Sequence, residues 1–455
     1  MTCTSQMVQC FDDDQKWIMQ AIIHRFIVSA SLVLSMSGPL WARPADSLVR
    51  RVQHQLVRLG QPYYFMGTNY WYGAAACITA QGRQRVAHEL DFLKAQGVTN
   101  VRVLAAGEGT GPINGMLRVT PAYQPQQGSF NESVLIGLDH LMVMLRQRGM
   151  TAVLYLSNNW DWSGGFLQYL NWNGLLPDVD MHRKLTWDEN RDVVSRFYTC
   201  EPCMAAYDIQ AQRIVSRTNT ITGQPYSHDV SLMAWELANE PRPMRPAAIA
   251  AYVQWIRRAS GLIKKNDPYH LVTTGSEGEA GSETIEVFTQ VHELPDIDYA
   301  TIHIWPKNWG WFSDTAIGQL LATVMANTQR YIEQHMAVAT RLQQPLVLEE
   351  FGLPRNGHSF SPSAATSLRD QYFTAVFAQL QRSAASGGVL AGCNFWGFAG
   401  SGRASKGHVF WQPGDALLAD PPQEEQGLNS VFDTDASTWQ LIRSFAQQLP
   451  TYQPH

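Results

Sequence analysis

Two glutamates have the setting that acid–base or nucleophilic chemistry needs. Glu240 lies in the stretch LMAWELANEPR at residues 232–242, and Glu350 lies in LVLEEFG at residues 346–352. The apolar start of the first stretch predicts a short buried strand, and Pro241 ends it because proline has no N–H for a strand ladder. We expect Glu240 to be extended at the strand tip, because the residue before a proline is biased toward that conformation. A carboxyl group held there can serve as a general acid or base.

The elements that must position these carboxyl groups alternate regularly. Eight short apolar runs predict strands buried on both faces, each followed by a helical pattern, and a small hairpin turning at Gly60 precedes them. This order predicts an α/β fold, a single-domain (β/α)8 TIM barrel over residues 43–455. An open doubly wound sheet is the alternative, but no glycine-rich phosphate fingerprint follows an early strand. The predicted strands are residues 63–68, 98–105, 151–160, 232–241, 269–276, 297–305, 345–352 and 388–398, and the predicted helices are residues 83–96, 133–148, 190–217, 246–265, 283–292, 317–342, 363–386 and 436–449.

Polar and aromatic residues gather at the ends of these strands, which is where barrel enzymes hold their chemistry. The strand interiors stay apolar. Because packing does not explain polar residues on one rim only, we predict a site there. The residues are Asn69, Trp71, Arg102, Asn158, Asn159, Trp160, Asn239, Glu240, Glu277, His303, Trp305, Glu350 and Trp396.

These residue types favour one chemistry over others. Only one histidine, His303, lies firmly at a strand end and no His-x-His pair occurs, so we expect no metal and no cofactor. No Gly-x-Ser-x-Gly elbow marks a strand-to-helix turn. Two carboxylates on different strands, with aromatic platforms for the apolar faces of sugars, suit glycoside hydrolysis. A non-catalytic carbohydrate-binding barrel is the alternative of another class, but it would have lost one of the two carboxylates.

Charge and the N-terminal segment narrow the class of protein further. The 455 residues carry a formal net charge of −5, which argues against a nucleic-acid partner. An apolar run at residues 26–36 follows His24 and Arg25 and resembles a secretory signal, too short to span a bilayer comfortably. We therefore predict that residues 1–42 are an N-terminal extension with a secretory signal, and that the mature chain is exported and has no stable membrane span.

Cys200 and Cys203 form a CxxC, and no second pair with metal-ligand spacing follows. In an exported protein a local disulfide in a loop is the favoured interpretation. Free thiols are the alternative.

Four motifs in order, WELANEP, HIWP, LEEFG and NFWGF, resemble glycoside hydrolase family five, within the retaining glycosidases that carry Asn-Glu on the fourth strand. HIWPKNWGW and VLEEFG are most similar to the mannan-degrading branch, the β-mannosidases and endo-β-1,4-mannanases. The resemblance covers about residues 63–449. It implies that Glu240 is the general acid/base and that Glu350 is the nucleophile, which forms a glycosyl-enzyme intermediate.

The same resemblance implies roles for the residues around the pair. Arg102 would hold the nucleophile ionised, Asn239 would bond the sugar 2-hydroxyl, His303 would orient the acid/base or the substrate, and Trp396 would form the floor of the subsite where the bond is cut. We also expect Asn159, Trp160 and Trp305 to bind substrate.

Trp305 and Glu349 affect the surroundings of the nucleophile. Many relatives carry Tyr where this chain has Trp305, and an indole N–H can donate a hydrogen bond but cannot accept one. The hydrogen bonding of Glu350 is therefore expected to differ in detail. Glu349 precedes the nucleophile, and strand alternation should send the two side chains to opposite faces.

Substrate length depends on two long loops, expected after the third and eighth strands at residues 161–188 and 400–431. Because the eighth strand neighbours the first, the second loop could close the glycone end. We therefore predict an exo-acting β-mannosidase that cuts β-1,4-mannosidic bonds of manno-oligosaccharides by double displacement. The alternatives are an endo-β-1,4-mannanase and a β-1,4-glucanase (cellulase), since mannose and glucose differ only at the 2-hydroxyl. Carboxyl groups about 5–5.5 Å apart would fit retention.

Overall fold

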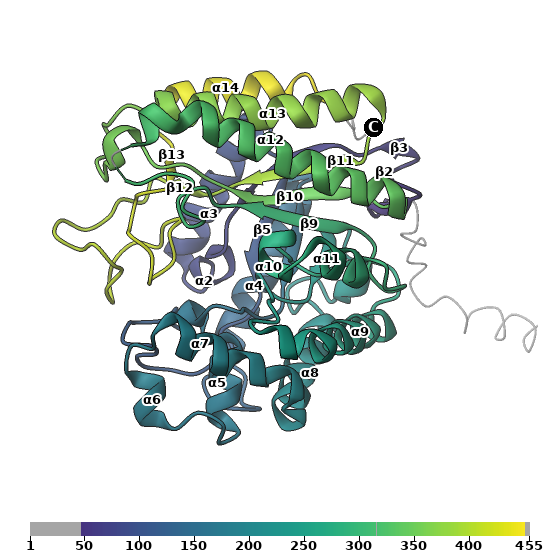
Figure 1. Ribbon diagram of the computed structural model, residues 1–455, viewed down its shortest axis with the longest axis vertical. Helices are drawn as coiled ribbons and strands as arrows, with labels where there is room; N and C mark the ends of the chain where they lie inside the picture. The colour runs from purple at the N-terminus through teal and green to yellow at the C-terminus, as the bar shows by residue number, and fades with distance from the viewer. Residues whose placement is uncertain (1–46, 315, 451–455) are drawn as a thin grey trace, which may run out of the picture. The chain divides into compact units, whose positions relative to one another are not determined.

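The computed structural model describes residues 47–314 and 316–450, and its centre is an eight-stranded parallel sheet. The strand order is β8-β7-β6-β5-β4-β11-β10-β9. The two end strands meet across a seam, where Asp298 N–H donates to Val272 O at 2.8 Å and Thr273 Oγ1–H donates to Tyr299 O at 2.9 Å. The (β/α)8 barrel predicted from the sequence is confirmed (Figure 1). The predicted secretory segment, residues 1–42, lies outside the described residues.

All eight predicted strands are present. Of the predicted polar residues, Asn69, Arg102, His303 and Glu350 lie on the strands, whereas Asn159, Asn239 and Glu240 lie in the loops that follow. Every strand residue is buried, because the strands pack on side chains inside the barrel and on helices outside. The strands are β4 (Phe65–Asn69), β5 (Asn100–Leu104), β6 (Thr151–Tyr155), β7 (Leu232–Glu236), β8 (Leu271–Thr273), β9 (Ala300–Ile304), β10 (Leu346–Phe351) and β11 (Leu390–Phe395).

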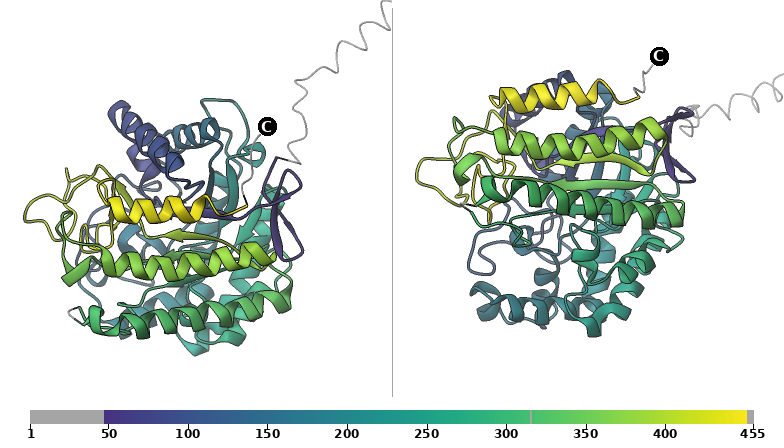
Figure 2. Two further views of the ribbon diagram at one scale, coloured as in Figure 1. Left: turned by 90° about the horizontal axis from the view of Figure 1, so that it is seen from above. Right: turned by 45° about the horizontal axis from the view of Figure 1, so that its top comes forward.

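The helices surround this sheet and begin and end at the signals expected of them. Asn131 caps α4 by accepting from Ser133 N–H, and Gly149 ends it in the left-handed conformation. In Figures 1 and 2, α12, α13 and α14 lie side by side along β9, β10 and β11. The principal helices are α3 (Ala80–Ala95), α4 (Glu132–Arg148), α8 (Glu201–Val215), α9 (Ile249–Asn266), α11 (Ile285–His292), α12 (Ile317–Leu342), α13 (Ser367–Ser386) and α14 (Ala436–Ala446).

A three-stranded sheet lies at the N-terminal end of the barrel. It comprises β1 (Arg50–Val52), β2 (Gln55–Arg58) and β3 (Gln61–Pro62), and the predicted turn at Gly60 is confirmed. Val49 and Leu56 share a buried apolar cluster with Phe65, Val153 and Met233 of the barrel strands. The bottom of the barrel is therefore covered, and Figure 1 shows the long yellow-green segment after β12 at the opposite end.

The predicted long loop at residues 161–188 is wrong, because most of this stretch is helical. It contains a 3-10 helix, η2 (Asp161–Ser163), then α5 (Gly165–Trp172) and α6 (Asp178–His182). Phe166 and Tyr169 of α5 are fully buried. The helix has only eight residues, too few for its apolar residues to establish a helical period in the sequence.

The single helix predicted for residues 190–217 is also wrong. The chain forms α7 (Trp187–Val194), a 3-10 helix η3 (Ser195–Thr199) and then α8. A new helix begins because Cys200 caps α8 in an extended conformation and proline follows within its first turn. The predicted Cys200–Cys203 disulfide is confirmed, at the start of a helix rather than in a loop.

The second predicted loop is confirmed: residues 401–430 contain no helix or strand. Its two ends are held together by β12 (Phe398–Gly400), which pairs with β13 (Val431–Phe432). In the described part of the chain, no helix is long and apolar enough to cross a bilayer.

Candidate active site

A cavity of about 440 Å³ opens at the C-terminal end of the barrel strands. Of the nine residues predicted to be catalytic or to bind substrate, six line it: Trp160, Asn239, Glu240, Trp305, Glu350 and Trp396. Arg102 and His303 are fully buried and contact this set from below. Asn159 is buried, does not line the cavity, and its side-chain atoms have no hydrogen-bond partner.

Glu240 lies four residues beyond β7 and is not extended, so that prediction is wrong. Its φ angle is +50°, a left-handed conformation that costs a non-glycine residue free energy. The backbone bonds of the turn override the bias from Pro241: Glu240 N–H donates to Gly275 O at 3.0 Å, and Asn239 N–H donates to Ser157 O at 2.9 Å. This turn directs the Glu240 side chain into the cavity.

Both oxygens of the Glu240 carboxyl group have partners. Trp160 Nε1–H donates to Oε2, and His303 Nδ1 shares a 2.7 Å hydrogen bond with Oε1. Burial raises the pKa of Glu240, against the effect of the Arg242 charge and the Trp160 hydrogen bond. A raised pKa favours the protonated form that a general acid requires.

Glu350, on β10, is held by a cation and by an indole. Arg102 Nη1–H donates to Oε1, and Trp305 Nε1–H donates to Oε2 at 2.9 Å. Arg102 thus makes the contact with Glu350 that its predicted role requires. Trp305, which departs from the family pattern, supplies a donor to the same carboxyl group. With donors on both oxygens, Glu350 is hydrogen-bonded as a carboxylate would be.

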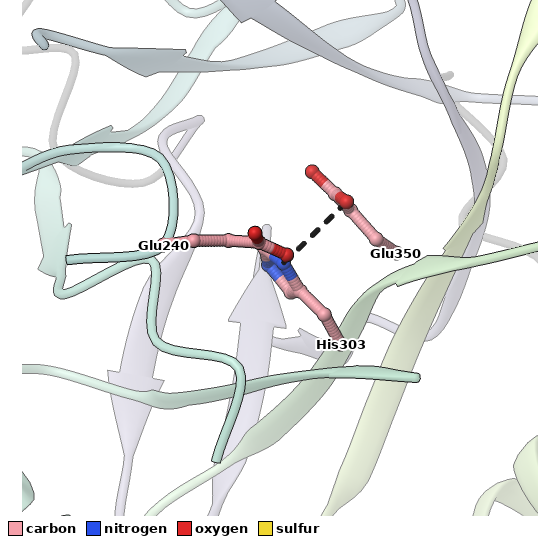
Figure 3. Close-up of side chains that lie close together, drawn as sticks. All are labelled: Glu240, His303 and Glu350. Carbon is pink, nitrogen blue, oxygen red and sulfur yellow. Dashed lines mark hydrogen bonds and ion pairs between the residues drawn. The ribbon is translucent and has the colours of Figure 1, made fainter. Parts of the chain in front are cut away.

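The two carboxyl groups approach one another closely. One oxygen of Glu240, one of Glu350 and a ring nitrogen of His303 all lie within 4.8 Å of each other. Figure 3 shows the three side chains converging, Glu240 from the loop after β7, His303 from β9 and Glu350 from β10. This separation fits the short spacing of retaining glycosidases and leaves no room for the water that an inverting pair encloses, which needs about 6.5–9.5 Å. A cation could also bridge these atoms, but His303 Nδ1 and Glu240 Oε1 are already bonded to each other.

Arg102 organises the base of the site. Its Nε–H donates to Glu236 Oε2 at 2.8 Å, and Nη2–H donates both to Glu236 Oε1 and to Asn239 Oδ1. Nη1–H donates to Asn69 Oδ1 at 3.1 Å as well as to Glu350. Sequence reasoning missed Glu236 as a functional residue, although a charged residue in an apolar strand is the signal that could have found it.

Glu349 lies inside the barrel beside Glu350, so the prediction of opposite faces is wrong. Its Oε2 lies 3.7 Å from Arg102 Nε and 3.9 Å from His303 Nε2, and Tyr299 Oη–H donates to its Oε1 at 3.1 Å. The pairing of β10 with β9 shifts register between Leu348 and Glu350, and such an irregularity breaks the alternation of faces. We call Arg102, Glu236, His303, Glu349 and Glu350 the carboxylate floor.

Asn239 retains a free donor position toward the cavity. Its Oδ1 accepts from Arg102, and one hydrogen of Nδ2 is donated to Asn158 Oδ1 at 3.1 Å. An amide nitrogen carries two hydrogens, so one remains for a ligand hydroxyl. The predicted role of Asn239 toward a sugar therefore has a suitable atom in place.

Aromatic residues that could equally have been packing residues also line the cavity. Trp162, Trp187 and Trp309 lie there, beside Arg242 and Glu277. Glu277 is buried and forms an ion pair with Arg242, so it is not part of a solvated loop. Arg242 in turn lies over the Trp160 ring, with its guanidinium carbon 5.0 Å from the ring centroid.

The segment after β12 supplies one side of the cavity. We call residues 420–429 the outer wall; those lining the cavity are Asp420, Pro421, Gln423, Glu424 and Asn429. Three contacts anchor the wall: Trp71 Nε1–H donates to Ala419 O at 2.8 Å, Ser430 Oγ–H donates to Asp420 Oδ2 at 2.7 Å, and Lys307 Nζ donates to Glu425 Oε2 at 3.1 Å. No sequence pattern identified these residues individually.

A second groove adjoins the cavity on the side of Arg242. The groove and the cavity share three lining residues, Trp187, Arg242 and Trp309. The groove is also lined by residues that do not reach the cavity, among them Met244 and Trp311. The outer wall therefore borders the cavity, and on the side of Arg242 the cavity continues into an aromatic groove.

Comparisons with known proteins agree with this geometry. A family model described as GH family 5 beta-mannosidase-like matches residues 46–453. Mannan endo-1,4-beta-mannosidase 1 of Arabidopsis thaliana is 29% identical over 405 residues, which cover 82% of this chain and 89% of that protein. Putative mannan endo-1,4-beta-mannosidase 9 of Oryza sativa subsp. japonica is 29% identical over 367 residues, covering 76% and 80%. A crystal structure of a glycoside hydrolase family 5 mannosidase from Rhizomucor miehei is 31% identical with a TM-score of 0.79, covering 89% and 98%.

Proposed function

Since the chain belongs to the β-mannosidase-like proteins of glycoside hydrolase family 5, and is therefore a glycoside hydrolase of the mannan-degrading branch, we propose that it cleaves β-1,4-mannosidic bonds with retention, using Glu350 as nucleophile and Glu240 as acid/base. The observation that carries this proposal is the approach of the two carboxyl groups to within 4.8 Å.

In the first step, a Glu350 carboxylate oxygen attacks the anomeric carbon while Glu240 gives its proton to the glycosidic oxygen. The bond to the leaving sugar breaks, and a mannosyl–Glu350 ester forms. In the second step, Glu240 removes a proton from water, whose oxygen attacks the same carbon and releases Glu350. Arg102 and Trp305, which donate to the two Glu350 oxygens, stabilise that carboxylate as the leaving group.

The position of the outer wall, residues 420–429, supports exo action. Glu240 protonates the oxygen of the leaving sugar, and Arg242, two residues further on, lines the open aromatic groove. The leaving sugars would therefore extend into that groove. The outer wall follows the strand next to Glu350 and lies on the side of the cavity that would hold the mannosyl unit. A wall there leaves room for a chain end, so we propose a β-mannosidase that removes terminal mannose.

Endo action is the second candidate, because the plant relatives carry the name mannan endo-1,4-beta-mannosidase. The products from mannohexaose separate the two. Mannose and mannopentaose alone at early times support exo action, whereas dimers, trimers and tetramers at early times contradict it. Comparing aryl β-mannoside with aryl β-glucoside tests the sugar, and NMR of the first-formed anomer tests retention; an initial α-anomer would contradict double displacement.

We also propose that the protein is exported. The Cys200–Cys203 disulfide supports this, because disulfides persist in oxidising compartments. The mass of the mature protein recovered from the exporting cell tests the predicted removal of residues 1–42. An intracellular protein of full mass would contradict export.

A further inference from the structure

Two buried polar atoms in the carboxylate floor lie near each other, and neither has a hydrogen-bond partner among the described residues. They are His303 Nε2 and Glu349 Oε2, which lie 3.9 Å apart. The other ring nitrogen of His303 is bonded to Glu240 Oε1, and the other oxygen of Glu349 accepts from Tyr299. Unpartnered polar atoms are costly in a protein interior. A small rotation of the Glu349 carboxyl group would bring the pair to hydrogen-bond distance.

The charges of the floor indicate which acid carries a proton. Arg102 is the cation in direct contact, and its hydrogen bonds go to Glu236 and Glu350. Glu349 receives only the Tyr299 hydroxyl, and its Oε2 is 3.7 Å from Arg102 Nε. Burial raises the pKa of Glu349 well above its usual value, and the nearby Glu236 charge adds to the effect. Burial raises the pKa of Glu350 as well, so the hydrogen bonds decide between the acids. Arg102 donates to Glu236 and to Glu350 but not to Glu349, and we therefore assign the proton to Glu349.

His303 is neutral as well. Burial lowers the pKa of this imidazole to about 3, and the Arg102 charge acts in the same direction. A neutral imidazole has one N–H, so either Nδ1 or Nε2 carries it. The titratable and charged groups around Glu349 and His303 are Arg102 from β5, Tyr155 from β6, Glu236 from β7, Glu240 and Arg242 after β7, Glu277 after β8, Tyr299 before β9 and Glu350 on β10.

We propose that Glu349 is a positioning residue which, as a neutral carboxylic acid, donates Oε2–H to His303 Nε2 and so fixes the histidine proton on Nδ1, toward Glu240. This proposal rests on the proposed role of Glu240 as acid/base. His303 Nδ1–H then always donates to Glu240 Oε1. The catalytic proton is left on Oε2, and the carboxylate that forms after proton transfer keeps a donor.

Removing the hydrogen bond from Glu349 to His303 Nε2 should raise the pKa of Glu240. Without a donor at Nε2, the histidine proton can move there, and the bare Nδ1 then accepts a hydrogen bond from a protonated Glu240 Oε1. This stabilises the acid form of Glu240, so its pKa rises, and it turns the proton toward His303 instead of the substrate. The basic limb of the kcat/KM profile would move to higher pH while kcat falls.

Glu349→Gln and Glu349→Leu are the matched test. A glutamine amide can accept from Tyr299 and donate to His303 Nε2, as the neutral acid does, whereas leucine cannot donate. With mannotriose, whose sugar leaving group needs a proton, we expect Glu349→Gln to keep the wild-type basic limb and Glu349→Leu to move it up by about one pH unit. A displaced basic limb in Glu349→Gln would overturn the proposal. So would an unchanged basic limb in Glu349→Leu.

Infrared spectroscopy gives a second readout that is independent of activity. The wild type at neutral pH should show a protonated-carboxyl band that Glu349→Gln lacks and that persists in Glu108→Gln. Glu108 is also a buried glutamate, but its carboxyl group bonds Gln210 and Gly165 instead of residues of the floor. A wild type without that band refutes the proposal even when Glu349→Leu does not fold. A wild type that leaves mannotriose intact refutes the proposed function instead, and the infrared result then still decides the protonation of Glu349.

Discussion

The carboxylate floor and the outer wall border the same cavity but are built in opposite ways. The floor comes from β5, β7, β9 and β10, and its side chains are almost completely buried. The outer wall belongs to the segment of residues 401–430, which contains no helix or strand, and its Glu424 is open to the cavity. Four strands fix the floor, whereas the wall depends on its paired ends and a few anchoring contacts.

This difference separates two properties of the site. Reacting groups must be held within a fraction of an ångström, which strands of a closed barrel achieve. Substrate length is determined by what stands in the way of a sugar chain, and a loop can change that without moving the floor. Variants that remove a charge or a hydrogen-bond donor from the floor should therefore alter turnover or stability, and variants in the wall should alter binding alone.

The largest effect is expected for Glu350→Ala. Without the proposed nucleophile no mannosyl-enzyme can form, so kcat on mannotriose should fall by at least about 10⁴-fold, as for other covalent catalysts. The unfolding temperature should not fall, because the removed carboxyl is buried beside Glu240 and Glu236, and Arg102 keeps its two hydrogen bonds to Glu236. Glu349→Gln, at the neighbouring position, is the control and should remain active. Near wild-type turnover in Glu350→Ala would contradict the assignment of the nucleophile.

Arg102→Met should have the largest effect on stability. It leaves Glu236 and Glu350 buried without their cation, and breaking a buried ion pair from one side costs about 3–5 kcal/mol. Urea unfolding measures the loss of free energy. Arg183→Met is the control, because its pairs with Asp180 and Glu189 are exposed, and it should unfold as the wild type does. Equal stability of the two variants would show that the floor does not depend on its arginine.

The same contrast explains what the sequence could predict. Periodic apolar runs identify the eight strands, and Glu240 and Glu350 follow from the ends of those strands. The position of Glu349 could not be predicted, because the shift between Leu348 and Glu350 depends on pairing with β9 rather than on local composition. The left-handed turn at Glu240 likewise depends on a backbone bond to Gly275, which belongs to the loop after another strand.

The cavity-lining residues of the wall could not be predicted for a different reason. Asp420, Glu424 and Asn429 follow no period, because a loop has no repeating geometry that links residue spacing to direction. The length of the segment was informative and its residues were not. The sequence of α5 does contain an apolar helical pattern, but the pattern is short because Phe166 and Tyr169 are only three positions apart.

Trp305→Phe tests the contribution of one hydrogen bond to the floor. It removes the Nε1–H that donates to Glu350 Oε2 and keeps an aromatic ring in place. A hydrogen bond to a charged group is worth about 1.5–3 kcal/mol, so kcat/KM should fall by about 10- to 150-fold. Trp311→Phe, in the adjoining groove, is the control and should affect KM alone. A Trp305→Phe variant with only a higher KM would make the indole a sugar contact instead.

The smallest effect is expected in the wall, at Glu424. This side chain is open to the cavity, but the surrounding chain partly desolvates its carboxyl group. This desolvation and the charge of the nearby Asp420 raise the pKa of Glu424 to about 7. In the wild type it therefore loses its proton as pH rises through that value, and the carboxylate accepts stronger hydrogen bonds from sugar hydroxyls. KM should be lower at about pH 8 than at about pH 6, by about 2- to 10-fold for one hydrogen bond. Glu424→Gln stays neutral, so its KM should not change over this range, while its kcat stays near that of the wild type. A variant that keeps the KM change would place the titrating group elsewhere, and a large loss of kcat would show that wall and floor are coupled.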